Sequence, residues 1–244
     1  MKATELAKAL NEIDDAYLAE LDTSGKERIT MKNRKKFSRI LIAAAVICLL
    51  SITAFAAEQA RVNSLVIKDK AYNENYEVLK QEMEKSGLDV NLPEQFTTGF
   101  RFQEVRTGEV EGTDDAGNLV MSFRELTAYY RNDNGQQVSL RMQPNLAEEG
   151  DTRTPTASKT VGGVTLNYYV DHYKFVPDGY EPSEEEQQWM QQPGNYLSYG
   201  SDEVVESAFA FLNWKTAEND FSIADMTASI NPDVLFAMAE EIIK

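Results

Sequence analysis

The stretch LVMSFRELTAYYRNDNGQQVSLRM, residues 119–142, contains two runs of alternating apolar and polar residues joined by a turn motif. Alternation with a period of two is typical of a β-strand with one covered face. Asn134-Gly135 lies between the runs and favours a hairpin, because both residues tolerate positive φ. The alternation changes phase at Arg124-Glu125, which is consistent with a bulge. The stretch therefore predicts an antiparallel hairpin.

Strand patterns continue on both sides of this hairpin. Phe100 and Phe102 alternate with polar residues before it, and TDDAGN (113–118) reads as a turn. VTLNYYVDHYKFV (164–176) and SAFAFLNWK (207–215) follow it, the second being the final strand that the pattern predicts. The polar stretch 145–158 reads as a loop. Large apolar residues on both faces of 207–215 suggest that both faces of the sheet are at least partly covered.

Helix signals accompany these strands. An amphipathic helix is expected over 71–86, with its apolar stripe formed by Tyr72, Tyr76, Leu79 and Met83. Ser183 and Glu186 form a capping box, and Asn231-Pro232-Asp233 has the signature of the start of the last helix. The predicted fold class is α+β, with an antiparallel sheet of about five to six strands and packed helices. One transmembrane helix and a short cytoplasmic helix are expected before this domain.

The transmembrane prediction rests on residues 40–57, which form 18 residues without a charge. As a helix they span about 27 Å, close to the roughly 30 Å of a bilayer's hydrocarbon core. Basic residues precede the run and are expected to contact anionic lipid headgroups: Lys32, Arg34, Lys35, Lys36 and Arg39. The positive-inside rule then places the N-terminus in the cytoplasm and the C-terminal domain outside. We expect a single-pass protein of the cell membrane.

The end of the apolar run also resembles a cleavage site. Ala54-Phe55-Ala56 followed by Ala57 matches the A-x-A pattern of signal peptidase. Cleavage there would make residues 1–56 a signal sequence and the remainder a secreted or surface-anchored binding protein. An uncleaved anchor is favoured because 39 residues precede the run, more than a signal peptide requires. The predicted division is a cytoplasmic leader (1–36), a transmembrane helix (37–57) and an extracytoplasmic domain (58–244).

The leader contains a patterned segment, TELAKALNEIDDAYLAEL (4–21). Its apolar residues recur at helical spacing and form one stripe that includes Leu6, Leu10, Ile13 and Tyr17. A single helix has no core of its own, so this stripe is expected to bind a cytoplasmic partner, another copy or the membrane surface.

Composition excludes several functions. Residues 58–244 carry fifteen Lys/Arg against thirty-three Asp/Glu, which argues against nucleic-acid binding. The single cysteine, Cys48, and the single histidine, His172, allow neither an intrachain disulfide nor a Cys/His zinc cluster. His172 is expected to be a partly buried, hydrogen-bonded strand residue, and no G-x-S-x-G or phosphate-binding glycine motif is present. The sequence predicts no enzyme, no catalytic residue, no cofactor and no metal.

Several segments carry a resemblance: LPEQFTTGFRFQEV (92–105), VGGVTLNYY (161–169), VPDGYEPSEEE (176–186), LSYGSDEVVESAFAFLNWK (197–215) and INPDVLFAMAEEIIK (230–244). Together with the leader they resemble single-pass membrane proteins of Gram-positive bacteria, of the clostridial type. In that group an extracytoplasmic domain of unknown function is often attached to anti-sigma-factor-like regulators. The resemblance implies a sigma factor or another cytoplasmic regulator as partner, and an unknown ligand or protein outside. It implies no catalytic residues.

Overall fold

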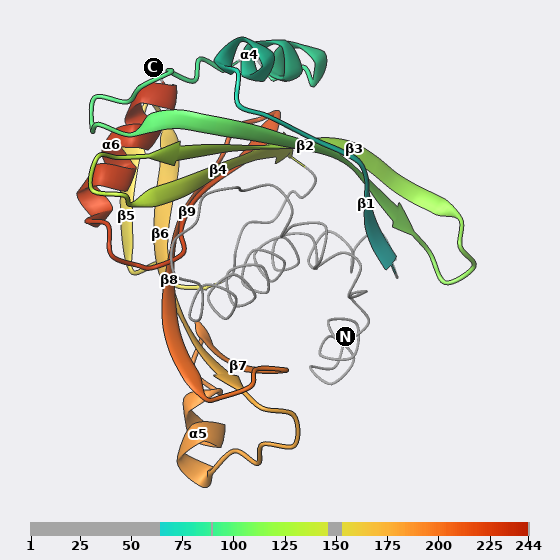
Figure 1. Ribbon diagram of the computed structural model, residues 1–244, viewed down its shortest axis with the longest axis vertical. Coiled ribbons are helices and arrows are strands. Elements are labelled where there is room, and N and C mark those ends of the chain that lie inside the picture. Colours follow the sequence, from blue (N-terminus) through green and yellow to red (C-terminus); the bar gives the residue numbers. More distant parts are fainter. Residues whose placement is uncertain (1–63, 89, 146–152, 244) are drawn as a thin grey trace, which may run out of the picture. The chain divides into compact units, whose positions relative to one another are not determined.

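The computed structural model describes residues 64–88, 90–145 and 153–243 (Figure 1). The elements follow one another as β1 (Ser64–Asn73), α4 (Tyr76–Lys85), β2 (Arg101–Thr113), β3 (Leu119–Arg131), β4 (Gln137–Pro144), β5 (Ala157–Val161), β6 (Val164–Val176), α5 (Glu184–Trp189), β7 (Asn195–Tyr199), β8 (Val205–Lys215), β9 (Asn219–Asp225) and α6 (Pro232–Ile243). The described part of the chain is therefore a mostly-sheet α+β fold, as the sequence predicts.

The described residues fall into two compact units. The larger unit contains 64–171 and 208–243, and its strands follow the order β1-β2-β3-β4-β9-β8-β6-β5. The smaller unit contains 172–207, where β7 pairs in parallel with the second half of β6, from His172 opposite Asn195 to Val176 opposite Tyr199.

The prediction of five to six antiparallel strands is wrong in two respects. Nine strands occur in the described ranges, and the β6–β7 pair is parallel. The sequence reading missed β1, β5, β7 and β9, and it placed the start of β5 in a loop. The helix expected over 71–86 begins only at Tyr76, because Asn75 caps it by accepting from the Glu77 N–H. Tyr72 accordingly belongs to β1 and is exposed.

The hairpin of 119–142 is confirmed. Asn132 organises its turn, since its side-chain Oδ1 accepts from the backbone N–H groups of Asn134 and Gln136, and Gly135 has the positive φ of +79° that the turn requires. The bulge expected at Arg124-Glu125 is absent, because the β2–β3 register runs unbroken through both residues. The phase changes because opposite faces of the same regular strand are buried on either side of this point.

Apolar residues of one face of the sheet meet α4 and α6, and we call this the helix-covered face. Leu79 and Met83 of α4 and Leu235 and Met238 of α6 belong to one core cluster with it. Figure 1 shows α4 beside β2 and α6 beside β5. The sheet residues of this cluster include Val105, Leu126, Ala128, Tyr130, Val138, Leu140, Met142, Leu212, Trp214, Phe221 and Ile223. Burial of these apolar side chains is the main favourable term in the stability of the larger unit.

Two predicted helix starts are confirmed. Ser183 and Glu186 make both hydrogen bonds of the capping box at the start of α5. α6 begins at Pro232, and the side chain of Asn231 accepts from the Asp233 N–H. No helix within the described ranges is long and apolar enough to cross a membrane. The apolar run of 40–57 lies outside those ranges.

Candidate functional site

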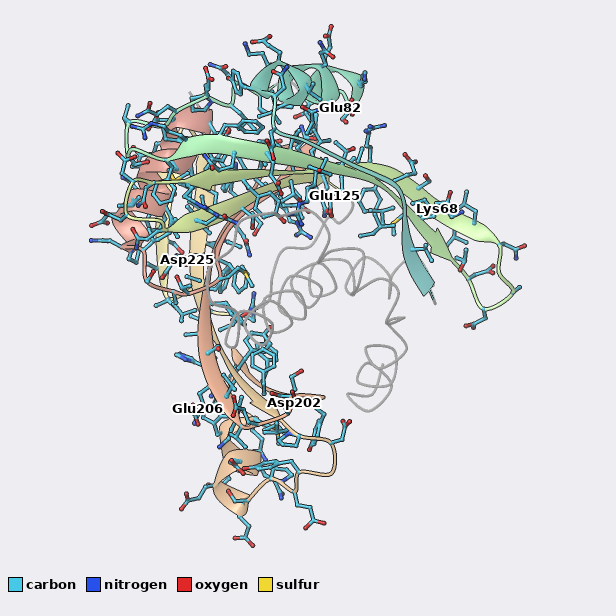
Figure 2. All side chains as sticks on the ribbon, viewed as in Figure 1. Lys68, Glu82, Glu125, Asp202, Glu206 and Asp225 are labelled. Atoms are coloured by element: carbon cyan, nitrogen blue, oxygen red, sulfur yellow. The ribbon has the colours of Figure 1, made fainter. Side chains whose placement is uncertain are left out.

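The second face of the larger unit's sheet carries a band of polar side chains between buried apolar residues that include Val110, Phe123 and Phe211, and we call it the polar face. Strand register defines it, because residues opposite each other across a ladder point to the same side. One row crosses the sheet through Arg106, Thr127, Arg141, Ser222 and Asn213. The adjacent row contains Gly108, Glu125, Gln143, Asp220 and Lys215. In Figure 2, Glu125 lies on this side of β2 and β3, and Glu82 of α4 lies on the other.

The centre of the polar face is a buried ion pair between Glu125 of β3 and Arg141 of β4. Arg141 Nη1 and Glu125 Oε2 are 3.8 Å apart, and each side chain is only 10% exposed. That separation is too long for a hydrogen bond. Neither of these two atoms has a hydrogen-bond partner in the described structure. Burial raises the pKa of the Glu125 carboxyl, and the nearby Arg141 lowers it by less.

Gln143 and Asp220 extend this cluster across β4 and β9. They are opposite each other in the ladder, and both are buried. The amide of Gln143 hydrogen-bonds the Asp220 carboxylate, whereas its Oε1 has no hydrogen-bond partner among the described residues. Lys215 Nζ is 3.5 Å from Asp220 Oδ2. Burial raises the pKa of Asp220, with Lys215 as the largest opposing influence.

We define the buried cluster as Glu125, Arg141, Gln143 and Asp220 together with Lys215, whose side chain is 34% exposed. It contains two carboxylates, two cations and one amide, so its formal charge balances. Its three unpartnered atoms are two acceptors, Glu125 Oε2 and Gln143 Oε1, and one donor, Arg141 Nη1. Buried polar groups in folded proteins nearly always have partners, and those without one need an explanation. The cluster is therefore the strongest candidate for a binding site in the described structure.

An open depression of about 370 Å³ lies on the same face, towards the other end of β2, β3 and β4. Its walls are polar and are formed by Glu74, Gln103, Glu104, Arg106, Tyr129, Arg131 and Gln137. Arg106 pairs with Glu104 at 2.6 Å and lies over the ring of Tyr129. Its register partner Thr127 separates it from Arg141, so the depression and the buried cluster belong to neighbouring parts of one polar surface.

Other polar side chains on this face form hydrogen bonds and ion pairs with each other. Arg153 donates through Nη1 to both carboxylate oxygens of Asp171, at 2.8 and 3.0 Å, and its guanidinium lies over the ring of Tyr169. Ser222 donates to the Asn213 side-chain oxygen at 2.7 Å. The contrast with these satisfied pairs distinguishes the buried cluster.

The smaller unit has a different character. Within 172–207 it carries eight Asp/Glu and one Lys. Glu186 accepts from Lys174, from the Tyr180 hydroxyl and from the Ser183 N–H. These hydrogen bonds, the one from Lys174 first, lower the pKa of Glu186 to about 2. The group is a satisfied structural network at the start of α5.

The structure tests only part of the residue predictions. The leader stripe, the basic residues and the alanines of the cleavage motif lie outside the described residues. His172 is exposed, contrary to the expectation of partial burial, although its backbone N–H does donate to the Gly194 carbonyl. Asp114 lies in a turn as expected and accepts from Ala116, Asn118 and the Asn118 amide. In the ranges that the structure describes, no group of three or more His, Cys, Asp or Glu residues is placed to hold a metal.

Sequence reasoning missed the buried cluster entirely. Glu125, Arg141, Gln143 and Asp220 stand at the polar positions of alternating strands, where the pattern indicates a solvated face. One signal was present, namely the phase change at Arg124-Glu125, where the apolar pattern moves from one face to the other. A comparison with protein-family models, with curated protein sequences and with solved structures finds no match for this chain.

Proposed function

We propose that this chain is a single-pass membrane regulatory protein of the anti-sigma-factor-like kind. Its extracytoplasmic domain senses a ligand, and its leader helix docks a cytoplasmic partner such as a sigma factor. The observation that carries the sensing role is the buried cluster, where a donor and two acceptors lack partners on a sheet face opposite the apolar core. Such atoms are costly unless something pairs with them, and a ligand would supply the partner.

The membrane and docking roles rest on the sequence. The uncharged run of 40–57 follows a basic cluster, which favours insertion with the N-terminus inside. The leader stripe of Leu6, Leu10, Ile13 and Tyr17 provides an apolar surface for a partner helix or groove. Because β1 begins at Ser64, only six residues separate it from Ala57, so a signal at the folded domain would have a short path to the anchor.

Topology and docking are tested together in cells. The full chain is expressed with an N-terminal tag, and intact protoplasts are treated with protease from outside. We expect digestion of 58–244 with the tag protected, and an intact chain by mass spectrometry before digestion. A mature N-terminus at Ala57 would instead indicate release after Ala56 and support a secreted or surface-anchored binding protein.

The docking role is tested by co-purification and identification of the bound protein. Leu10→Asp with Ile13→Asp places two charges on the stripe and should abolish capture of a transcriptional regulator. Glu12→Ala with Asp15→Ala changes two residues on the opposite side of the same helix and serves as the matched control. Equal capture by both double variants and by the unmodified chain would contradict a docking helix.

A further inference from the structure

We propose that the buried cluster on the polar face binds the ammonium and carboxylate groups of a small free α-amino acid. This inference deepens the proposed sensing function and rests on it for its biological role. The binding chemistry itself follows from the positions of Glu125, Arg141 and Gln143.

The three unpartnered atoms come from neighbouring positions of two paired strands. Leu126 is the ladder partner of Met142, so Glu125 and Gln143, one residue further along each strand, lie side by side on the polar face. Arg141 occupies the adjacent position of the same face, with Nη1 at 3.8 Å from Glu125 Oε2. Arg141 Nη1 and Glu125 Oε2 do not hydrogen-bond each other, so a ligand with a donor for Glu125 and an acceptor for Arg141 can bond both atoms.

The pattern of the unpartnered atoms matches a zwitterion. An ammonium carries three N–H donors and can donate to Glu125 Oε2 and Gln143 Oε1 at the same time. A carboxylate on the adjacent carbon can accept from Arg141 Nη1. The ammonium–Glu125 contact and the carboxylate–Arg141 contact each join opposite charges, and charge-assisted hydrogen bonds are about twice as strong as neutral ones.

Charge balance favours the same class of ligand. The cluster contains Glu125 and Asp220 against Arg141 and Lys215, so an anion would meet two carboxylates and a cation would meet two positive groups. A neutral zwitterion adds no net charge to this buried site, where an uncompensated ion is expensive. The raised pKa of Glu125 agrees, because it indicates that Arg141 alone does not compensate the buried carboxylate. Hydroxyl groups of a sugar would make hydrogen bonds but would leave that charge uncompensated.

Isothermal titration calorimetry of the full chain in lipid nanodiscs tests this assignment. The probes are glycine, L-alanine, acetate, methylammonium and N-acetyl-alanine amide. We expect glycine or L-alanine to bind, and the other three, each lacking one or both charged groups, to bind at least about tenfold more weakly. Binding of N-acetyl-alanine amide or acetate with the affinity of L-alanine would overturn the zwitterion assignment.

Variants locate the site. Arg141→Gln and Glu125→Gln should each weaken L-alanine binding by about tenfold to a hundredfold. Arg124→Gln is the matched control, because Arg124 forms an Arg–Glu pair with Glu82 on the opposite face of β3. Arg124→Gln should leave the affinity unchanged. Unchanged affinity in Arg141→Gln would refute the site.

A measurement on the unmodified chain covers the case in which a cluster variant fails to fold. Protonation removes the negative charge of Glu125 and with it the charge-assisted hydrogen bond to an ammonium, so the affinity for L-alanine should fall as the pH is lowered from about 8 to about 4, just below the ordinary pKa of a Glu carboxyl. Both groups of the free amino acid remain charged over this range. A pH-independent affinity, no binding of any zwitterion, or a crystal structure grown with L-alanine that contains only a bridging water would each refute the proposal. The protease and capture experiments above use no ligand, so these outcomes are separate from a failure of the membrane and docking roles.

Discussion

Replacing Arg141 with methionine should destabilise the larger unit strongly at neutral pH and only weakly at acidic pH. Methionine is unbranched and fills part of the space of the arginine stem, but it removes the positive charge beside Glu125. Glu125 and Arg141 are 3.8 Å apart with side chains 10% exposed, so water offers Glu125 little compensation. The perturbation therefore leaves one buried, uncompensated carboxylate.

The magnitude follows from the separation and the burial. Two unit charges at 3.8 Å attract by about 4 kcal/mol at an effective dielectric constant of about 20. Breaking a buried pair by removing one partner typically costs about 3–5 kcal/mol, in agreement with that figure. The double variant Glu125→Met with Arg141→Met removes both charges. Its free energy of unfolding should lie between that of the parent chain and about 4 kcal/mol above it, because both desolvation costs are removed.

The pH dependence has a definite sign. Burial raises the pKa of Glu125 in the folded state above its unfolded value of about 4.3, and removal of Arg141 raises it further. The folded state then binds more protons than the unfolded state between these two pKa values. The contribution of Glu125 to stability is consequently greatest below about pH 4 and is lost as the pH rises through its folded pKa. The free energy of unfolding of Arg141→Met should fall more steeply between about pH 5 and pH 8 than that of the parent chain.

Urea unfolding followed by tryptophan fluorescence measures these differences. Trp189 belongs to the smaller unit and Trp214 to the larger one, so a Trp189→Phe background makes the signal report the larger unit alone. The parent chain, the two single methionine variants and the double variant are compared at about pH 5 and at about pH 8. The slope of each unfolding transition checks two-state behaviour. A cost below about 1 kcal/mol for Arg141→Met at pH 8, or a double variant less stable than both single variants, would refute the reasoning.

Three further predictions concern stability. In Gly108→Ala the new Cβ would lie 2.4 Å from Ile67 Cγ2, so the free energy of unfolding in urea should fall by about 1–3 kcal/mol. Addition of Ile67→Ala should restore most of this loss, and an unchanged midpoint in the single variant would contradict the contact. Ser183→Ala removes half of the capping box with Glu186 and should cost about 1 kcal/mol, measured as faster amide hydrogen exchange in α5, with no change expected in α6. Asp225→Ala orphans the buried N–H of Ile230 and should lower the free energy of unfolding by about 2–3 kcal/mol, whereas a loss below about 0.5 kcal/mol would show that the loop can reorganise without this carboxylate.

The sequence predicts the local features of the fold well, because they depend on neighbouring residues. The Asn134-Gly135 hairpin, the Ser183 capping box and the start of α6 at Pro232 all follow from short-range rules on turns and caps. The alternation of apolar and polar residues also predicts which side of β3 and β4 is covered by the core. These signals act within a few residues, so tertiary context rarely reverses them.

The missed strands depend on partners far away in the chain. β9 (Asn219–Asp225) has Asp220 and Asp225 near its ends, yet β4 and β8 flank it on both sides. β7 pairs with β6 in parallel, and parallel pairing is set by a long connection rather than by a turn motif. The sequence of β1, SLVIKDKAYN, is half polar, and its last three residues lie in the helix expected over 71–86. Its ladder with β2 is what makes it a strand.

The candidate site could not be predicted, because its defining property is burial of residues that the alternation marks as polar. Glu125 and Arg141 read as the solvent side of amphipathic strands, and nothing local distinguishes them from exposed residues such as Arg131. Only the assembled sheet brings Glu125, Gln143 and Asp220 into one row. The leader stripe and the basic cluster lie outside the described residues and remain predictions.

Stability and binding make opposite demands on the buried cluster, and this opposition separates a binding site from a structural ion pair. If the Glu125–Arg141 pair served only the fold, a better-packed apolar replacement would be tolerated at little cost to any other property. If the pair serves a ligand, the double methionine variant should gain or keep stability and lose L-alanine binding altogether. Chains retain such unfavourable groups where function requires them and compensate elsewhere, here through the apolar helix-covered face of the same strands. A double variant that is less stable yet still binds L-alanine would reverse the assignment and make the pair a structural feature.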